Sequence, residues 1–335
     1  MSEVKTFDIL VAGGGMIGSA LALGLSRQGW HVALVEGSDH ETLVRAPEPA
    51  ATVVDFEPRV SAISVASQRL LEQLGVWSEV TAGRHCPYQT MTVWDGDGTG
   101  RIQFEAAELQ ARALGTIVEN RSIVRALFRA LEQSPVELIE GASITGCRRS
   151  SGSYALELED GQSLSAGLVV GCDGANSRLR QWVGLPTREW DYDQQAIVCT
   201  VQPSQSHRFT AWQRFSMTGP LAFLPLLPES GSEHFCSIVW SQDTDEARRL
   251  MALEDTEFAA ELEQAIEREL GSVQAVSKRF AFPLRQRHAT DSIALGFALV
   301  GVAPPSLHPP AGQCDNPGFR PLSPPAGAPA PGRAA

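Results

Sequence analysis

Apolar and polar positions near the N-terminus follow the pattern of a strand, a turn, a helix and a second strand. The run over residues 7–12 is apolar apart from Asp8, as expected of a strand buried in a parallel sheet. Small and apolar residues then recur at helical spacing over residues 19–26, and a second run over residues 31–35 ends in Glu36. This order predicts a β–α–β unit at the start of an α/β domain.

The turn of this unit carries glycines at positions 13, 15 and 18, in the G-x-G-x-x-G spacing. Gly13 allows the tight turn, Gly15 lets a pyrophosphate approach the backbone, and Gly18 lets the helix pack closely on the strand. The helix N-terminus attracts phosphate, and Glu36 is placed to accept hydrogen bonds from a ribose hydroxyl. We predict a dinucleotide site. A glycine-rich turn without a ligand is the alternative, and the unit does not distinguish FAD from NAD.

The middle of the chain alternates helical and strand patterns. Residues 37–58 are polar and predict a loop, whereas two amphipathic helices are expected over residues 67–77 and 123–131. The expected short strands are 91–94, 101–104, 136–139, 154–158 and 168–171. The first two of these strands flank an Asp-Gly turn and therefore predict a hairpin.

From about Thr187 to Phe282 the pattern changes to alternating strands with an acidic helix over residues 255–270. Residues 219–226 are apolar but contain two prolines, which favours an edge strand or a cavity wall. The chain then returns through an apolar strand expected over residues 293–301. This region predicts a second, mostly antiparallel lobe.

A polar motif, D-G-x-x-S-x-x-R, follows the strand over residues 168–171. Asp173 can accept hydrogen bonds from ribose or backbone donors, Gly174 permits an unusual turn, and Ser177 can cap the next helix. On its own, a strand followed by a capped helix is equally typical of a structural junction. Paired with the glycine fingerprint, the motif favours cofactor binding.

The composition narrows the class of protein. The 335 residues are 43% hydrophobic and 20% charged, which is typical of a globular chain large enough for two lobes. A net charge of −12 argues against nucleic acid or anionic lipid as a partner. We find neither a signal peptide nor an apolar run near the ~18 residues that a membrane span needs. The six scattered cysteines show no metal-like spacing and favour a reducing cytosol.

Together these stretches resemble the flavoprotein aromatic hydroxylases of the para-hydroxybenzoate hydroxylase fold, and within them the ubiquinone-biosynthesis branch that acts on polyprenylphenols. The resembling segments are 9–36, 58–77, 115–120, 168–180, 219–226 and 236–241. The implied fold class is α/β (α+β), with a Rossmann-like FAD-binding domain and a discontinuous, mostly antiparallel β substrate domain. The implied FAD-binding segments are 1–85, 105–186 and 285–319, and the substrate segments are 86–104 and 187–284.

The resemblance also implies a set of FAD-binding residues. The ADP half would be held by Gly13, Gly15, Gly18 and Glu36. The other implied contacts are Arg59, Arg125, Asp173, Gly174, Gly301 and Gly312. Arg59 would lie near the flavin, although a solvated arginine fits the residues equally well, and Asp173 with Gly174 would bridge the FAD region and the approach of NAD(P)H.

In this family the cofactor carries the chemistry. NAD(P)H reduces the flavin, O₂ converts it to a flavin hydroperoxide, and a phenol ring takes up the distal oxygen while the protein excludes water. We therefore predict no catalytic side chain, because His85 and His234 fit better as satisfied or exposed histidines. The implied substrate is a hydrophobic phenol, with Leu221, Ala222 and Phe223 as cavity walls. The implied location is cytoplasmic, peripheral to the inner membrane, with other ubiquinone-biosynthesis proteins as partners.

The sequence departs from this family near its end. Val302 stands where the family has an aspartate that binds the ribityl chain, and Pro317 and Pro321 fall where the family begins a helix. Residues 320–335 are rich in proline and alanine and predict a disordered tail, whereas the family continues for several helices. Two alternatives stay open: an impaired FAD-binding member that serves as a partner in a biosynthetic assembly, and another enzyme on the same flavin fold, such as an oxidase or halogenase.

Overall fold

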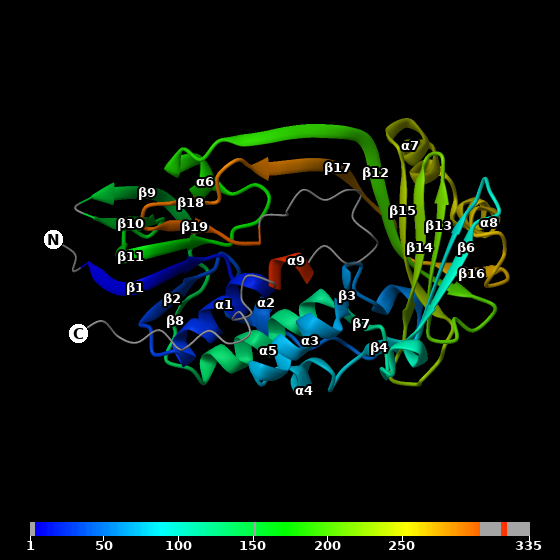
Figure 1. Cartoon of the computed structure of the whole chain (residues 1–335), viewed down its shortest axis with the longest axis horizontal. Helices are drawn as coiled ribbons and strands as arrows, with labels where there is room; N and C mark the ends of the chain where they lie inside the picture. Colours follow the sequence, from blue (N-terminus) through cyan, green and yellow to red (C-terminus); the bar gives the residue numbers. More distant parts are fainter. Residues whose placement is uncertain (1–3, 151, 302–315, 320–335) are drawn as a thin grey trace.

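Three sheets organise the chain in the computed structural model, which describes residues 4–150, 152–301 and 316–319 (Figure 1). The first sheet has a parallel centre. Its strands, in spatial order, are β18 (Ile293–Ala294), β19 (Phe297–Leu299), β11 (Ser163–Gly171), β1 (Lys5–Ala12), β2 (Val32–Val35) and β8 (Glu137–Ile139). Strands β10 (Ser153–Leu158) and β9 (Ile144–Ser150) extend it from β11 as antiparallel neighbours. The predicted β–α–β unit is confirmed, because β1 and β2 pair in parallel around α1 (Met16–Arg27).

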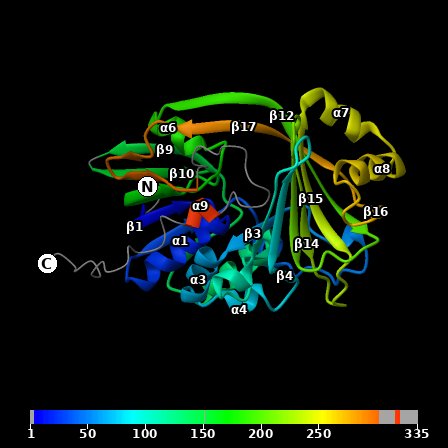
Figure 2. The same cartoon turned by 45° about the vertical axis from the view of Figure 1, so that its right-hand side comes forward.

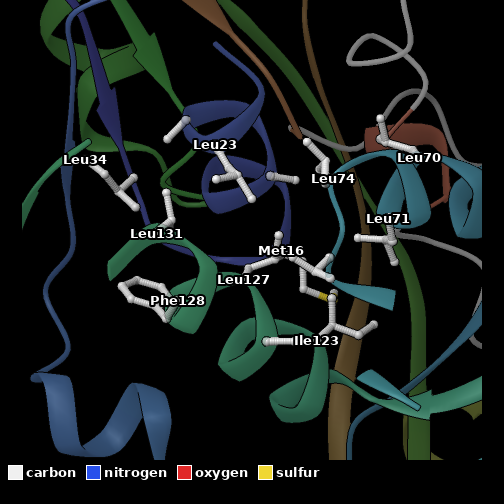
Figure 3. Close-up of a cluster of buried hydrophobic side chains, with 14 of the residues drawn as sticks. Met16, Leu23, Leu34, Leu70, Leu71, Leu74, Ile123, Leu127, Phe128 and Leu131 are labelled. Carbon is white, nitrogen blue, oxygen red and sulfur yellow. The ribbon is translucent and has the colours of Figure 1, made fainter. Parts of the chain in front are cut away.

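Helices pack on one face of this sheet and build its core. Helix α5 (Asn120–Glu132) buries Ile123, Leu127 and Leu131, which are four residues apart and so share one face. In Figure 3 these side chains lie in one cluster with Leu23 of α1 and Leu34 of β2. The smaller helices of this lobe are α2 (His40–Val44), α3 (Val65–Gln73), α4 (Trp77–Val80), α6 (Arg178–Val183) and α9 (Asn316–Phe319). The core fixes α1 against the strand that carries the glycine turn.

The second large sheet is antiparallel apart from the pair of β13 and β5. Its strands, in spatial order, are β16 (Val273–Val276), β12 (Thr187–Pro203), β15 (Phe235–Asp243), β14 (Gly219–Leu226), β13 (Thr210–Ser216), β5 (Thr90–Asp95) and β6 (Arg101–Glu105). Helices α7 (Thr244–Ala252) and α8 (Asp255–Ala265) lie on its outer face (Figure 2). The long strands β12 and β17 (Phe280–Ala289) pair with each other and connect the two lobes (Figure 1).

A small sheet of β3 (Val60–Ser64), β7 (Gly115–Glu119) and β4 (His85–Tyr88) lies between the two large sheets. Two short 3₁₀ helices, η1 (Val53–Asp55) and η2 (Ala106–Leu109), flank this region. Buried apolar side chains join the small sheet to β14, among them Ala62 and Ile117 on one side and Ala222 and Leu224 on the other. The inner face of the antiparallel sheet therefore packs toward the lobe that carries the glycine turn.

The structure corrects four local expectations. Residues 219–226 form a central strand rather than an edge strand, because β14 pairs with both β13 and β15. Residues 37–58 include α2, whose N-cap Asp39 accepts from the Thr42 amide at 2.8 Å, and η1. The strand expected over 293–301 is split into β18 and β19 around Gly296, whose φ is +77°. The acidic helix ends at Ala265.

The division into two domains stays a prediction. The predicted substrate segments join the antiparallel sheet except at residues 86–88, which belong to β4 and pair with β7 instead. Strand β17 also continues beyond the predicted boundary at residue 284. The expectation of a disordered tail over residues 320–335 lies outside the described residues.

Candidate functional site

The glycine turn after β1 has the geometry that its spacing predicts. Gly13 has a φ of +105°, and a Cβ there would lie 2.4 Å from the Cys172 carbonyl oxygen. A Cβ on Gly18 would lie 1.9 Å from the Gly13 carbonyl oxygen, so the start of α1 packs directly on the turn. A Cβ on Gly15, in contrast, would have no neighbour within 4 Å. The turn is therefore closed on the protein side and open at Gly15.

Glu36 lies beside this turn at the end of β2. Its Oε2 accepts a hydrogen bond from the Gly14 amide at 2.6 Å, and its Oε1 accepts one from the Ser38 amide at 2.8 Å. A carboxylate offers about four lone-pair sites, so two remain for a ligand. The two amides fix the carboxylate in place, and it keeps the capacity to accept from a ribose.

Asp173 reaches the same place from the neighbouring strand β11, which pairs with β1. Its Oδ2 accepts from the amides of Arg178 at 2.9 Å and Leu179 at 3.3 Å, and Ser177 caps α6 by accepting from the Arg180 amide at 3.0 Å. Gly174 adopts a φ of +79°. The junction thus has the capped-helix structure that we considered as an alternative, and its Asp173 also faces the glycine turn.

A cavity of about 320 Å³ brings Gly13, Glu36 and Asp173 together. The rest of its lining is Val35, Gly37, Ala142, Ser143, Ile144, Arg178, Leu179 and Trp182. Arg178 is a lining residue that was not predicted from the sequence, and its guanidinium lies 4.8 Å from the ring centroid of Trp182. The position of Arg178 inside the D-G-x-x-S-x-x-R motif was the available signal.

The remaining predicted cofactor residues lie outside that lining. Arg59 is exposed, and its side chain makes no hydrogen bond or ion pair among the described residues. Arg125 is buried on α5, 3.6 Å from Glu79. Gly301 has a φ of +75° and packs beside Ile17 at the start of α1, where a Cβ would lie 3.3 Å away. Gly312 and Val302 lie outside the described residues.

These features fit the ADP half of FAD. The open side of Gly15 at the N-terminus of a 12-residue helix suits a pyrophosphate, because backbone N–H groups and the helix dipole favour an anion there. The cavity beside Glu36 suits the adenosine ribose. Gly13, Gly15, Gly18 and Glu36 are the residues we expect to hold this half.

A second, narrow cavity of about 10 Å³ lies between the small sheet and the inner face of the antiparallel sheet. Its lining is Ala62, Tyr88, Met91, Ala211, Trp212, Gln213, Ala222 and Leu224. Of the walls expected from the sequence, Ala222 lies here, but Leu221 and Phe223 pack on the opposite face, in the core shared with α7 and α8. That expectation was wrong because successive side chains of a strand point to opposite faces.

A buried ion pair connects the small sheet to the segment before β3. The Nη2 of Arg84 donates to both carboxylate oxygens of Glu119, at 3.0 and 2.9 Å, and both side chains are 3% exposed. Arg84 also donates to the Asp55 carbonyl at 3.3 Å, and Glu119 accepts from the Glu57 amide at 2.9 Å. This pair was not predictable from the sequence, because its members are 35 residues apart and share no motif.

The fold and the site define a class of protein, the α/β flavoproteins with a Rossmann-type FAD site. The FAD binding domain family matches residues 6–316, and this chain belongs to that family. The 3-demethoxyubiquinol 3-hydroxylase of Escherichia coli is 39% identical over 316 residues, which cover 93% of this chain and 77% of the relative. The ubiquinone hydroxylase UbiL of Rhodospirillum rubrum is 37% identical over 95% of this chain and 71% of its own length.

Solved structures agree on the fold. Pseudomonas aeruginosa PqsL, in complex with 2-aminobenzoylacetate, superposes with a TM-score of 0.75 at 23% identity, over 95% of this chain and 84% of that one. The p-nitrophenol 4-monooxygenase PnpA of Pseudomonas putida superposes with a TM-score of 0.68 at 17% identity, over 89% and 73%. The predicted fold class is confirmed, and FAD is the cofactor that the family defines.

We expect Glu36→Ala to weaken FAD binding by about tenfold to a hundredfold, because the half-buried carboxylate that would accept from the ribose is lost. Titration of the apoprotein with FAD, followed by flavin fluorescence, measures the change. Glu41→Ala is the matched control, since this carboxylate lies on α2 outside the cavity lining. Equal affinity in the Glu36 variant and the wild type would contradict the ribose assignment.

Proposed function

We propose that this chain is an FAD-dependent monooxygenase that hydroxylates the aromatic ring of a polyprenylphenol intermediate in ubiquinone biosynthesis, with NAD(P)H as reductant. The observation that carries the proposal is the 39% identity to 3-demethoxyubiquinol 3-hydroxylase, because it extends over 93% of the chain and so includes both lobes. The role of a non-catalytic partner is not favoured, since the relatives reported above are named as hydroxylases.

Bound FAD supplies the activation of O₂ with electrons from NAD(P)H. The chain's own residues bind and enclose the reactants. The backbone at Gly15 and the start of α1 hold the pyrophosphate, and Glu36 orients the ribose. The apolar side chains between the small sheet and β14 exclude water from the space between the lobes.

An exposed apolar strip supports a substrate with a long hydrocarbon tail. Strand register places Phe104 opposite Met91 and Ile102 opposite Val93, so these side chains share the face that carries the narrow cavity. Ile102 is 52% exposed and Phe104 is 44% exposed. Phe215 extends the strip on β13. We propose that the tail leaves the cavity along this strip, defined by Ile102, Phe104 and Phe215.

We also propose that the chain acts in the cytoplasm at the surface of the inner membrane, where polyprenyl tails reside. Among the described residues, no helix has the length and apolar character to cross a bilayer. The net charge of −12 disfavours adsorption to anionic lipid, so the apolar strip or another protein of ubiquinone biosynthesis would mediate the contact.

The test is NAD(P)H oxidation by the FAD-loaded protein with 2-prenylphenols of increasing tail length. We expect hydroxylated product, and an affinity that rises with tail length by up to about 0.8 kcal/mol per buried CH₂ until the strip ends. Product is quantified separately from hydrogen peroxide. Bound FAD with no hydroxylated product at any tail length would contradict the enzymatic proposal and favour the partner role.

A further inference from the structure

The polar side chains of Tyr88 and Gln213 line the narrow cavity together with apolar residues and Trp212. Tyr88 is 6% exposed and Gln213 is 5% exposed, and neither side chain makes a hydrogen bond within the part of the chain that the structure describes. Buried polar groups are normally paired, and leaving one unpaired costs free energy. Neither the Tyr88 hydroxyl nor the Gln213 amide is among the described polar atoms that are sealed from solvent without a partner, so both keep accessible surface at which a ligand can complete their hydrogen bonds.

Both side chains face the inside of the cavity. Gln213 precedes Arg214, which faces the other side of the sheet and pairs with Glu267 at 3.1 Å. It follows Trp212, which belongs to the core with α7 and α8 and also lines the cavity. Gln213 pairs across the ladder with Ala222, which lines the cavity. Tyr88 pairs with Gly115, where a Cβ would lie 2.8 Å from the tyrosine hydroxyl. The glycine leaves the space that this hydroxyl needs.

We propose that Tyr88 and Gln213 bind the oxygen substituent of the aromatic ring, so that the ring enters with its hydroxyl toward this pair and its tail toward the apolar strip. This inference rests on the proposed function. A phenol hydroxyl both donates and accepts a hydrogen bond, and a glutamine amide and a tyrosine hydroxyl together offer both complements. Burial raises the pKa of Tyr88, so its hydroxyl stays a donor at neutral pH.

The cavity also selects against charged rings. None of the described residues that line it is charged, so a carboxylate placed there would have no counter-ion. At about 10 Å³ the cavity holds no more than one water molecule, so a ring enters only when a wall moves. Met91 is the wall best suited to move, because its unbranched side chain adapts to the shape of its neighbours.

The experiment compares a short-chain 2-prenylphenol with its methyl ether, which cannot donate a hydrogen bond. Calorimetric titration of the FAD-loaded protein gives both dissociation constants without turnover. We expect the wild type to bind the phenol about tenfold to a hundredfold more tightly than the ether, because the ether leaves buried polar groups unpaired. In Tyr88→Phe and in Gln213→Leu the ratio should fall toward one, with FAD affinity unchanged and the KM for the phenol raised more than kcat is lowered.

The matched controls make the same two changes, tyrosine to phenylalanine and glutamine to leucine, at buried positions outside the narrow cavity. Tyr154→Phe changes a buried tyrosine of β10 in the other lobe, and Gln242→Leu changes a buried glutamine of β15 outside the cavity lining. Both controls should keep the wild-type ratio. Wild-type discrimination that survives in both Tyr88→Phe and Gln213→Leu would overturn this inference alone. A wild type that binds neither compound would overturn the proposed function, and this inference with it.

Discussion

Replacing Gly15 by alanine should weaken FAD binding severely and leave the apoprotein as stable as the wild type. Gly15 is the N-cap of α1, with a φ of −64° and a ψ of −179°, an extended conformation that any residue adopts. A Cβ there meets no protein atom within 4 Å, so folding has no reason to change. The added methyl group would instead occupy the side from which the pyrophosphate approaches the backbone. We expect an affinity loss of at least about a hundredfold, measured by fluorescence titration.

The contrasting variant is Gly18→Ala, which should lose stability as well as FAD. Its Cβ would lie 1.9 Å from the Gly13 carbonyl oxygen, which is backbone and has no side-chain freedom to move away. Such overpacking costs about 1–3 kcal/mol or more, which urea unfolding of the apoprotein would detect. If Gly15→Ala binds FAD as the wild type does, the pyrophosphate does not pass over Gly15 and the placement of the cofactor is wrong.

The parts of the fold that local patterns specify were predictable. The glycine turn between two apolar runs specifies β1, α1 and β2, because steric limits and hydrophobic spacing act within about 30 residues. The central place of β14 was not predictable, because it depends on pairing with β13 and β15. Its prolines suggested an edge, yet Pro220 and Pro225 are the second residue from either end of the strand, where lost ladder hydrogen bonds disrupt pairing least.

The candidate site also contains residues that could be predicted from the sequence and residues that could not. Gly13, Glu36 and Asp173 could be predicted because each follows a strand of one parallel sheet, and the carboxyl ends of such strands meet at one edge. Tyr88 and Gln213 could not, because they belong to different sheets that only tertiary packing brings together. Strand alternation alone separates Ala222 from Leu221 and Phe223, so the placement of these three side chains on opposite faces was predictable.

Replacing Arg84 by methionine should destabilise the protein by about 3–5 kcal/mol, because it leaves the Glu119 carboxylate buried without its counter-ion. Both side chains are 3% exposed, so water cannot take over the role of the guanidinium. The change also removes the donor to the Asp55 carbonyl, which helps to fix the segment that leads into β3. Urea unfolding at neutral pH measures the loss.

The pH dependence of this loss identifies its cause. Burial raises the pKa of Glu119, although Arg84 and the Glu57 amide act against the rise, so removal of Arg84 should raise it further. A folded-state pKa above the unfolded one means that stability falls as pH rises through the folded value, so the deficit should be smaller at about pH 5.5 than at about pH 8. In the variant that lacks Arg84, a second substitution, Glu119→Gln, should recover most of the stability and remove this pH dependence. A deficit that neither acid nor Glu119→Gln reduces would not come from an unpaired buried charge. It would come from the other contacts of Arg84, which are the hydrogen bond to the Asp55 carbonyl and the contact with Phe56, whose ring centroid lies 5.3 Å from the guanidinium carbon.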